Sequence, residues 1–121
     1  MDSLYKTIDT IVAHQKKARQ NNDFYTLMKN GEALLEYMPD LIRYSVEQES
    51  EYRKFEAKLA NERDDTGKMR TGSFCETQAK ATEFYANWQK AKLFIELIYE
   101  MVQMSKKLAG SVDKELQASS N

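Results

Sequence analysis

The residue types that most often carry catalysis are scarce in this chain. There is one histidine, His14, and one cysteine, Cys75, and they are far apart in the sequence. Nucleophilic catalysis needs a nucleophile beside a base, and a metal site needs several nitrogen, sulfur or oxygen ligands. These two residues form neither set. We therefore predict no enzyme activity, no metal and no cofactor, and we expect His14 to lie at the surface.

Cys75 has two interpretations. It falls in the first turn of a predicted helix, where a thiol can become a reactive nucleophile. The alternative is a small apolar filler near the turn of a helical pair, because free cysteine is among the most buried residue types. We favour the filler.

The polar stretch NERDDTGKMRTG, residues 61–72, could suggest an ion or phosphate site. A calcium loop of the EF-hand type needs oxygen ligands at alternate positions and a glutamate at the twelfth, which the Asp64-Asp65 pair does not begin. Gly67-Lys68 lacks the first glycine and the following serine or threonine of a P-loop. The stretch is predicted to be a solvated turn.

Lysine and arginine cluster at two predicted helix ends. Cations are favoured at the C-terminal end of a helix, so such clusters also occur without a binding function. Beside tyrosines that could stack bases, they still make a candidate nucleic-acid patch. The patch would consist of Lys16, Lys17, Arg19, Lys106 and Lys107, with Tyr5, Tyr25 and Tyr99 as stacking side chains.

Composition narrows the class of partner. The 121 residues include 18 basic and 19 acidic ones, a net charge of −1, so neither the basic excess of a DNA-coating protein nor the acidic excess of a DNA mimic is present. A mean hydropathy of −0.73 argues against a membrane span. The N-terminus MDSLYKTIDTIVAHQKK lacks the apolar block of a signal peptide. With one cysteine, which fits a reducing compartment, we expect a cytoplasmic protein without membrane contact.

Apolar residues recur at helical spacing along the first half of the chain. A first helix is capped by Asp2 or Ser3 and ends at Asn21-Asn22. A second begins at Asn22 or Asp23 and passes in phase through Gly31 to Met38. A third runs from about residue 40 to about residue 63, after Pro39, which separates it from the second helix.

Residues 73–109 predict one long helix. Ser73 and Glu76 match the S-x-x-E capping box, and the apolar positions that follow alternate steps of three and four. Gly110 is the expected stop, leaving 111–121 as a mobile tail. The apolar stripe widens after Leu93, so two neighbours must cover that half.

The elements predict an all-α fold in one domain. Its centre is a long antiparallel helical hairpin over 39–110, made of helices ~40–63 and ~73–109, with the two N-terminal helices of 1–38 packed on its base as in a helical bundle. Folding the chain at 61–72 places Tyr52 near Ala81.

Two helices alone cannot cover every apolar side chain on the hairpin. Exposed aromatic patches mark protein–protein surfaces, and a second copy of the hairpin would complete a four-helix bundle. The predicted interface residues are Tyr52, Phe55, Phe84, Tyr85 and Trp88.

Residues 51–98 resemble small helical-hairpin proteins of tailed phages. Those proteins combine a helix carrying Y-R-x-x-x-A, a loop with R-x-G-S, and a long helix with spaced alanines and Y-x-x-W-Q-x-A. The matching residues are Tyr52, Arg53, Ala57, Arg70, Gly72, Ser73, Ala79, Tyr85, Trp88, Gln89 and Ala91. The resemblance implies a phage origin, the cytoplasm of a bacterial host, and no catalytic residues.

Three functions stay open. The leading hypothesis is a non-enzymatic phage-type assembly or adaptor protein, a homo-oligomer that self-associates through the hairpin. The second is an accessory protein of phage DNA replication or recombination that binds nucleic acid through the basic patch. The third is an inhibitor that binds a host protein with its aromatic surface.

Overall fold

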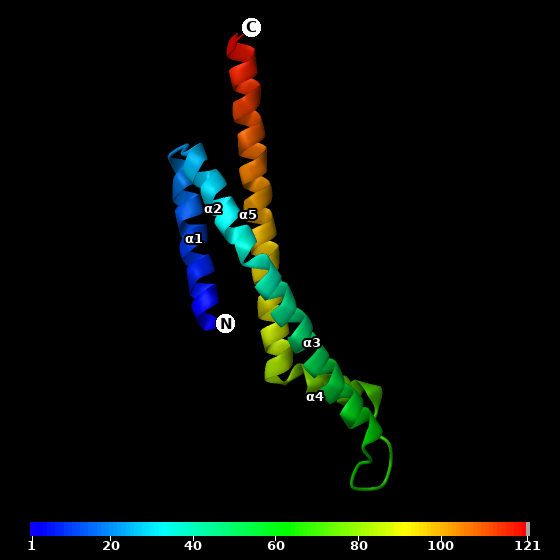
Figure 1. Cartoon of the computed structure of the whole chain (residues 1–121). Coiled ribbons are helices and arrows are strands. Elements are labelled where there is room, and N and C mark those ends of the chain that lie inside the picture. Colours follow the sequence, from blue (N-terminus) through cyan, green and yellow to red (C-terminus); the bar gives the residue numbers. More distant parts are fainter. Residues whose placement is uncertain (121) are drawn as a thin grey trace. The chain divides into compact units, whose positions relative to one another are not determined.

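The computed structural model describes the backbone of residues 1–120 and the side chains of residues 1–108. Five helices follow one another along the chain (Figure 1). They are α1 (Asp2–Gln20), α2 (Phe24–Glu36), α3 (Met38–Asn61), α4 (Gly72–Lys80) and α5 (Glu83–Ser120). The described part of the chain has no strand, only an isolated bridge between Arg63 and Met69. The predicted all-α fold is therefore confirmed.

The helices form two compact units. The first unit joins Met1–Pro39 to the chain from Phe94 onward, and the second is Asp40–Leu93. α1, α2 and the later part of α5 belong to the first unit, whereas α3, α4 and the start of α5 build the second.

In the first unit, α1 and α2 pack side by side in opposite directions (Figure 1). Asn22 takes a positive φ of 54° at the turn between them. Asp23 then caps α2: the Thr26 amide donates to its Oδ1 at 3.1 Å and the Thr26 hydroxyl to its Oδ2 at 2.6 Å. These hydrogen bonds lower the pKa of Asp23, with the hydroxyl as the larger cause. The predicted turn and cap are thus both confirmed.

The core of the first unit lies between these two helices and α5. Its wholly buried apolar side chains are Ile8, Leu27, Leu34 and Ile98. The ring of Tyr5 packs on that of Phe94, with centroids 4.3 Å apart. α5 is therefore covered from Phe94 onward by the N-terminal helices, as the widening of its apolar stripe predicts.

Helix α2 approaches α5 closely at Gly31. A methyl group added there would meet Oγ of Ser105 at 3.4 Å. Gln15 is wholly buried beside this point, and its Nε2 donates to the Leu27 carbonyl at 3.1 Å and to the Ser105 hydroxyl. One polar contact thus links α1, α2 and α5, and the prediction that α2 continues through Gly31 is confirmed.

In the second unit, α3 runs antiparallel to α4 and the start of α5 (Figure 1). The tip between α3 and α4 is organised by Asp64, whose Oδ1 accepts from the Thr66 amide at 2.9 Å, the Thr66 hydroxyl at 2.6 Å and the Lys68 amide at 3.0 Å. Gly67 supplies the positive φ of 80° that the turn requires. The predicted turn is therefore an ordered loop with its own hydrogen bonds.

The helix predicted over ~73–109 starts within one residue of the predicted position, but it is interrupted at Ala81 and Thr82 and continues past 109. The chain leaves the helix at Ala81 and Thr82, where the Thr82 hydroxyl donates to the Ala79 carbonyl at 2.7 Å and accepts from the Tyr85 amide at 3.4 Å. A threonine side chain that bonds the local backbone in this way competes with the helical ladder. Tyr52 packs on Tyr85, four residues after the predicted neighbour Ala81.

The start of α4 and the end of α5 differ from the predicted boundaries, and each difference is local. Thr71 caps α4 by accepting from the Phe74 amide at 3.1 Å, so Ser73 lies inside the helix and does not form the predicted capping box. At the other end, α5 continues past Gly110 to Ser120, and Gly110 does not take the positive φ of a glycine stop. The predicted mobile tail, 111–121, is helical in its backbone as far as Ser120, whereas its side chains and residue 121 lie outside the described part.

Helix α3 starts at Met38, two residues before the predicted boundary, and only Tyr37 separates it from α2. Pro39 lies in its first turn, where a missing N–H costs little. Pro39 therefore belongs to the first turn of α3, a position that its fixed φ suits.

Candidate interaction surface

Three aromatic rings meet between α3 and α5 in the second unit. The ring centroids of Tyr52 lie 5.2 Å from Tyr85 and 5.6 Å from Trp88, and those of Tyr85 and Trp88 are 6.0 Å apart. Tyr52 is only 3% exposed, whereas the other two are half-buried. The cluster is thus core on one side and surface on the other.

Two cations cover the exposed side of this cluster. The guanidinium of Arg53 lies 5.0 Å from the Tyr52 ring centroid and 5.7 Å from that of Trp88. The Lys92 ammonium lies 4.6 Å from the Trp88 centroid. Each contact of this kind contributes about 0.5–1 kcal/mol at an exposed site, so they hold the side chains without closing the surface.

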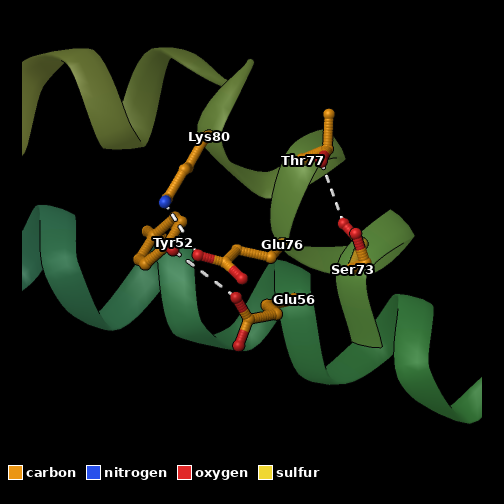
Figure 2. A network of polar contacts seen from close by, with 6 residues as sticks. All are labelled: Tyr52, Glu56, Ser73, Glu76, Thr77 and Lys80. Atoms are coloured by element: carbon orange, nitrogen blue, oxygen red, sulfur yellow. Dashed lines mark hydrogen bonds and ion pairs between the residues drawn. The ribbon is translucent and has the colours of Figure 1, made fainter. Parts of the chain in front are cut away.

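A polar network borders the cluster on the α4 side (Figure 2). Glu76 and Lys80 of α4 form an ion pair at 2.7 Å, and the Tyr52 hydroxyl donates to Glu56 at 3.4 Å. The hydrogen bond between Glu76 and Lys80 lowers the pKa of the carboxyl and raises that of the ammonium. Burial, followed by the charge of Glu56, raises the pKa of Tyr52.

The register between α3 and α5 is set by one more hydrogen bond. Nδ2 of Asn87 donates to Oε1 of Gln48 at 3.1 Å. Together with the aromatic cluster, it places the start of α5 beside the middle of α3 and keeps the two helices antiparallel.

An apolar strip lies beside Arg53 on α3. Ile42, Val46, Glu49 and Arg53 recur at steps of four, three and four residues, which places them on one stripe of the helix. Glu49 forms an ion pair with Arg53 at 3.7 Å. Ile42 is 47% and Val46 59% exposed. Because Arg53 also contacts Trp88, this stripe and the indole share one side of the second unit, called below the hairpin flank: Ile42, Val46, Arg53, Trp88 and Lys92.

The structure changes the predicted interface. Tyr52, Tyr85 and Trp88 do come together, but Tyr52 is buried and cannot touch a partner. Phe55 and Phe84 are half-buried and have no ring contact among the described residues. The predicted interface did not include Ile42 and Val46. The available signal was a pair of β-branched apolar residues four apart that lie outside the buried stripe of α3.

The predicted basic patch is divided. All five side chains are exposed, but they border different hollows of the first unit. Arg19 and Lys107 line one of about 440 Å³ together with Tyr99 and Glu100, and Nη1 of Arg19 lies 3.3 Å from the sulfur of Met104. Lys17 lines a hollow beside Asp23, and Lys106 lines one between α2 and α5. Lys16 lines none of these three.

The remaining candidate residues have ordinary surroundings. Cys75 is 2% exposed, which confirms the buried filler, and His14 is exposed. Across the described residues, no three His, Cys, Asp or Glu side chains are grouped so as to hold a metal ion. No helix in that part of the chain combines the length and apolar character needed to cross a membrane.

Compared with known proteins, the chain matches no family model, no curated protein and no solved structure. The fold defines it as an all-α, bundle-like helical protein.

Proposed function

We propose that the protein is a non-enzymatic helical assembly or adaptor protein whose copies associate through the hairpin flank. The observation that carries this proposal is the exposure of Ile42 and Val46 on the same stripe of α3 as Arg53, whose guanidinium lies over the half-buried Trp88. Apolar residues grouped with an aromatic anchor are typical of a protein–protein surface.

The size of the flank indicates weak association. Fully burying a valine or isoleucine side chain stabilises by about 1.5–3 kcal/mol, and these two are already about half covered. Association itself costs an estimated 4–15 kcal/mol. Four such side chains from two copies, with two indoles, therefore support a reversible, concentration-dependent contact.

The test is the native mass of the wild type and of Val46→Lys, measured by light scattering over a range of concentrations. The substitution puts a charge in the proposed contact and should reduce the mass. Leu93→Lys is the matched control, because Leu93 is 64% exposed in the same unit but outside the flank. A wild type whose mass equals one chain at high concentration would contradict the proposal, as would equal effects of the two lysines.

Trp88→Ala extends the test to the aromatic anchor. It should also reduce the mass, but it removes a ring that packs on Tyr52, so its circular dichroism must first match that of the wild type.

The phage origin and the bacterial cytoplasm belong to this proposal and are supported by the resemblance of residues 51–98. An inhibitor of a host protein would use the same flank without self-association. A monomeric wild type that captures one host protein, and loses it in Val46→Lys, would favour that alternative.

A second candidate function is binding of single-stranded nucleic acid in the first unit. Arg19, Lys107 and the exposed ring of Tyr99 border one hollow, which combines cations with a stacking surface. Glu100 in the same hollow opposes this function, so it ranks second.

The test of nucleic-acid binding is fluorescence anisotropy with labelled single-stranded DNA. Binding should weaken steeply between about 50 and about 200 mM salt and should be lost in Arg19→Glu. Lys6→Glu is the control, because Lys6 is exposed on α1 and borders none of the hollows described above. No binding at the lower salt would exclude this function.

A further inference from the structure

A second apolar surface lies in the first unit and shares no residue with the hairpin flank. It is a hollow of about 140 Å³ between α2 and α5, called here the α2 groove. Its lining residues are Met28, Gly31, Glu32 and Leu35 of α2 with Val102, Ser105 and Lys106 of α5. Met28 is 50% and Leu35 46% exposed, so the α2 rim of the groove is open. We propose that the α2 groove is where a second copy of this chain docks, with its α2 antiparallel to the first.

The spacing of the rim residues is suited to a two-fold contact. Met28 and Leu35 are seven residues apart on one helix face and equally far from the midpoint between Gly31 and Glu32. In an isologous pair the same patch contacts itself. An antiparallel pair of α2 helices that cross at this midpoint therefore places each Met28 against Leu35 of the second copy.

The floor of the groove allows a close approach. Gly31 is buried and has no side chain, and α2 and α5 already lie close together there. Helices pack with axes about 8–10 Å apart, and small residues permit the lower values. A volume of about 150 Å³ can hold a benzene-sized group. The groove of each copy can therefore accept one apolar side chain from the other copy.

The charges on the walls indicate that the occupant is this same chain. Glu32 stands on the α2 wall and Lys106 on the α5 wall. Among residues with described side chains, neither has an ion-pair partner. When α2 of a second copy enters the groove, its Glu32 comes to the side of Lys106, and the symmetry makes this pair twice.

This inference rests on the proposed function, because it adds a second self-contact to the hairpin flank. One two-fold contact gives a dimer, whereas two different ones on the same chain allow a tetramer or a longer assembly. The wild type should therefore exceed the mass of a dimer. The Val46→Lys protein should form only a dimer, held by the α2 groove. A protein with a substitution that blocks the α2 groove should form only a dimer held by the hairpin flank.

Directed cross-linking tests the α2 contact by itself. In a Cys75→Ala background, Met28→Cys and Leu35→Cys proteins are mixed and oxidised. The mixed disulfide should form faster than either like pair, because only that pair meets across the two-fold axis at disulfide distance. Lys29→Cys mixed with Leu35→Cys is the control, since Lys29 is exposed on another face of α2. No preference over this control, or a preference for like pairs, overturns the proposal.

Charge exchange gives a second readout. Glu32→Lys should lower the mass by one association step, and adding Lys106→Glu should restore it, because the pair is then re-formed with reversed signs. A double variant that stays as small as the single one overturns the charge pairing. The cross-link must also persist in Val46→Lys, so a failed hairpin flank and a failed α2 groove give different results.

Discussion

A single buried polar side chain links three helices of the first unit. Gln15 has no exposed surface, and its Nε2 donates to the Leu27 carbonyl and the Ser105 hydroxyl, while its Oε1 has no hydrogen-bond partner among the described residues. The hydroxyl of Ser105 also donates to the Met101 carbonyl at 3.0 Å, so it keeps a partner if the amide is removed. The amide therefore orients α1 more than it stabilises the unit.

This gives a prediction for Gln15. Gln15→Leu should change the free energy of unfolding by less than about 1.5 kcal/mol, because it removes an unpaired oxygen and keeps the volume. Gln15→Glu should cost about 3 kcal/mol or more, since it buries an unpaired charge beside a carbonyl. Urea denaturation measures both, with the exposed Gln20→Leu as control. Equal costs would show that the amide itself is essential.

The second residue-scale prediction concerns Tyr52. Burial raises the pKa of its phenol above the usual 10.0. The folded state then binds this proton more tightly than the unfolded chain, so the stability is fully present below pH 10.0 and falls as the pH rises through the folded-state pKa. Tyr52→Phe should flatten that alkaline loss and change stability at pH 7 by less than about 1 kcal/mol. Tyr25→Phe, at an exposed ring, should leave the alkaline loss unchanged in denaturation at several pH values.

At the scale of elements, the break between α4 and α5 decides what the second unit presents. The helix stops at Lys80, and a threonine cap restarts it at Glu83. On the restarted helix, the rings of Tyr85 and Trp88 pack on Tyr52. The cations of Arg53 and Lys92 lie over the indole of Trp88. The part of the hairpin flank that contains Trp88 and Lys92 therefore lies on the helix that Thr82 caps.

A proline at residue 83 tests this break. Glu83 is the first residue of α5, where proline is well tolerated, so Glu83→Pro should cost less than about 1 kcal/mol. In a continuous helix the same change would cost about 3 kcal/mol. Glu96→Pro, at an exposed site inside α5, is the control and should show that larger cost. Thermal unfolding followed by circular dichroism separates the two, and equal costs would mean that the helix is unbroken.

At the scale of the whole molecule, the two units divide the proposed contacts. The hairpin flank belongs to the second unit and the α2 groove to the first, and α5 contributes to both units. Self-association should therefore have two parts that can be blocked separately.

Coupling between association and stability gives the last prediction. Because a second copy binds the folded chain and not the unfolded one, the Tm should rise as protein concentration increases from about 5 to about 500 μM. Val46→Lys combined with Glu32→Lys should remove this dependence while leaving the Tm at the lowest concentration nearly unchanged. Differential scanning calorimetry provides the measurement, and a Tm independent of concentration in the wild type would contradict both contacts.

Local patterns account for what was predicted correctly. The all-α fold, the turn at Asn22-Asp23, the helix through Gly31 and the buried Cys75 follow from apolar spacing and capping residues, which act within one or two turns. The boundaries at Thr71, Thr82 and Gly110 were missed, because alternative caps differ by only about 1 kcal/mol and nearby packing can reverse them.

The sequence by itself determined that this chain is helical and which stripes of its helices are apolar, because spacing and caps are properties of neighbouring residues. Only the tertiary structure decided that Tyr52 is buried, that Ile42 and Val46 are exposed, and that Glu32 and Lys106 line the same groove. Those facts depend on contacts between residues far apart in the chain, whose packing energies outweigh the small local differences that periodicity reports.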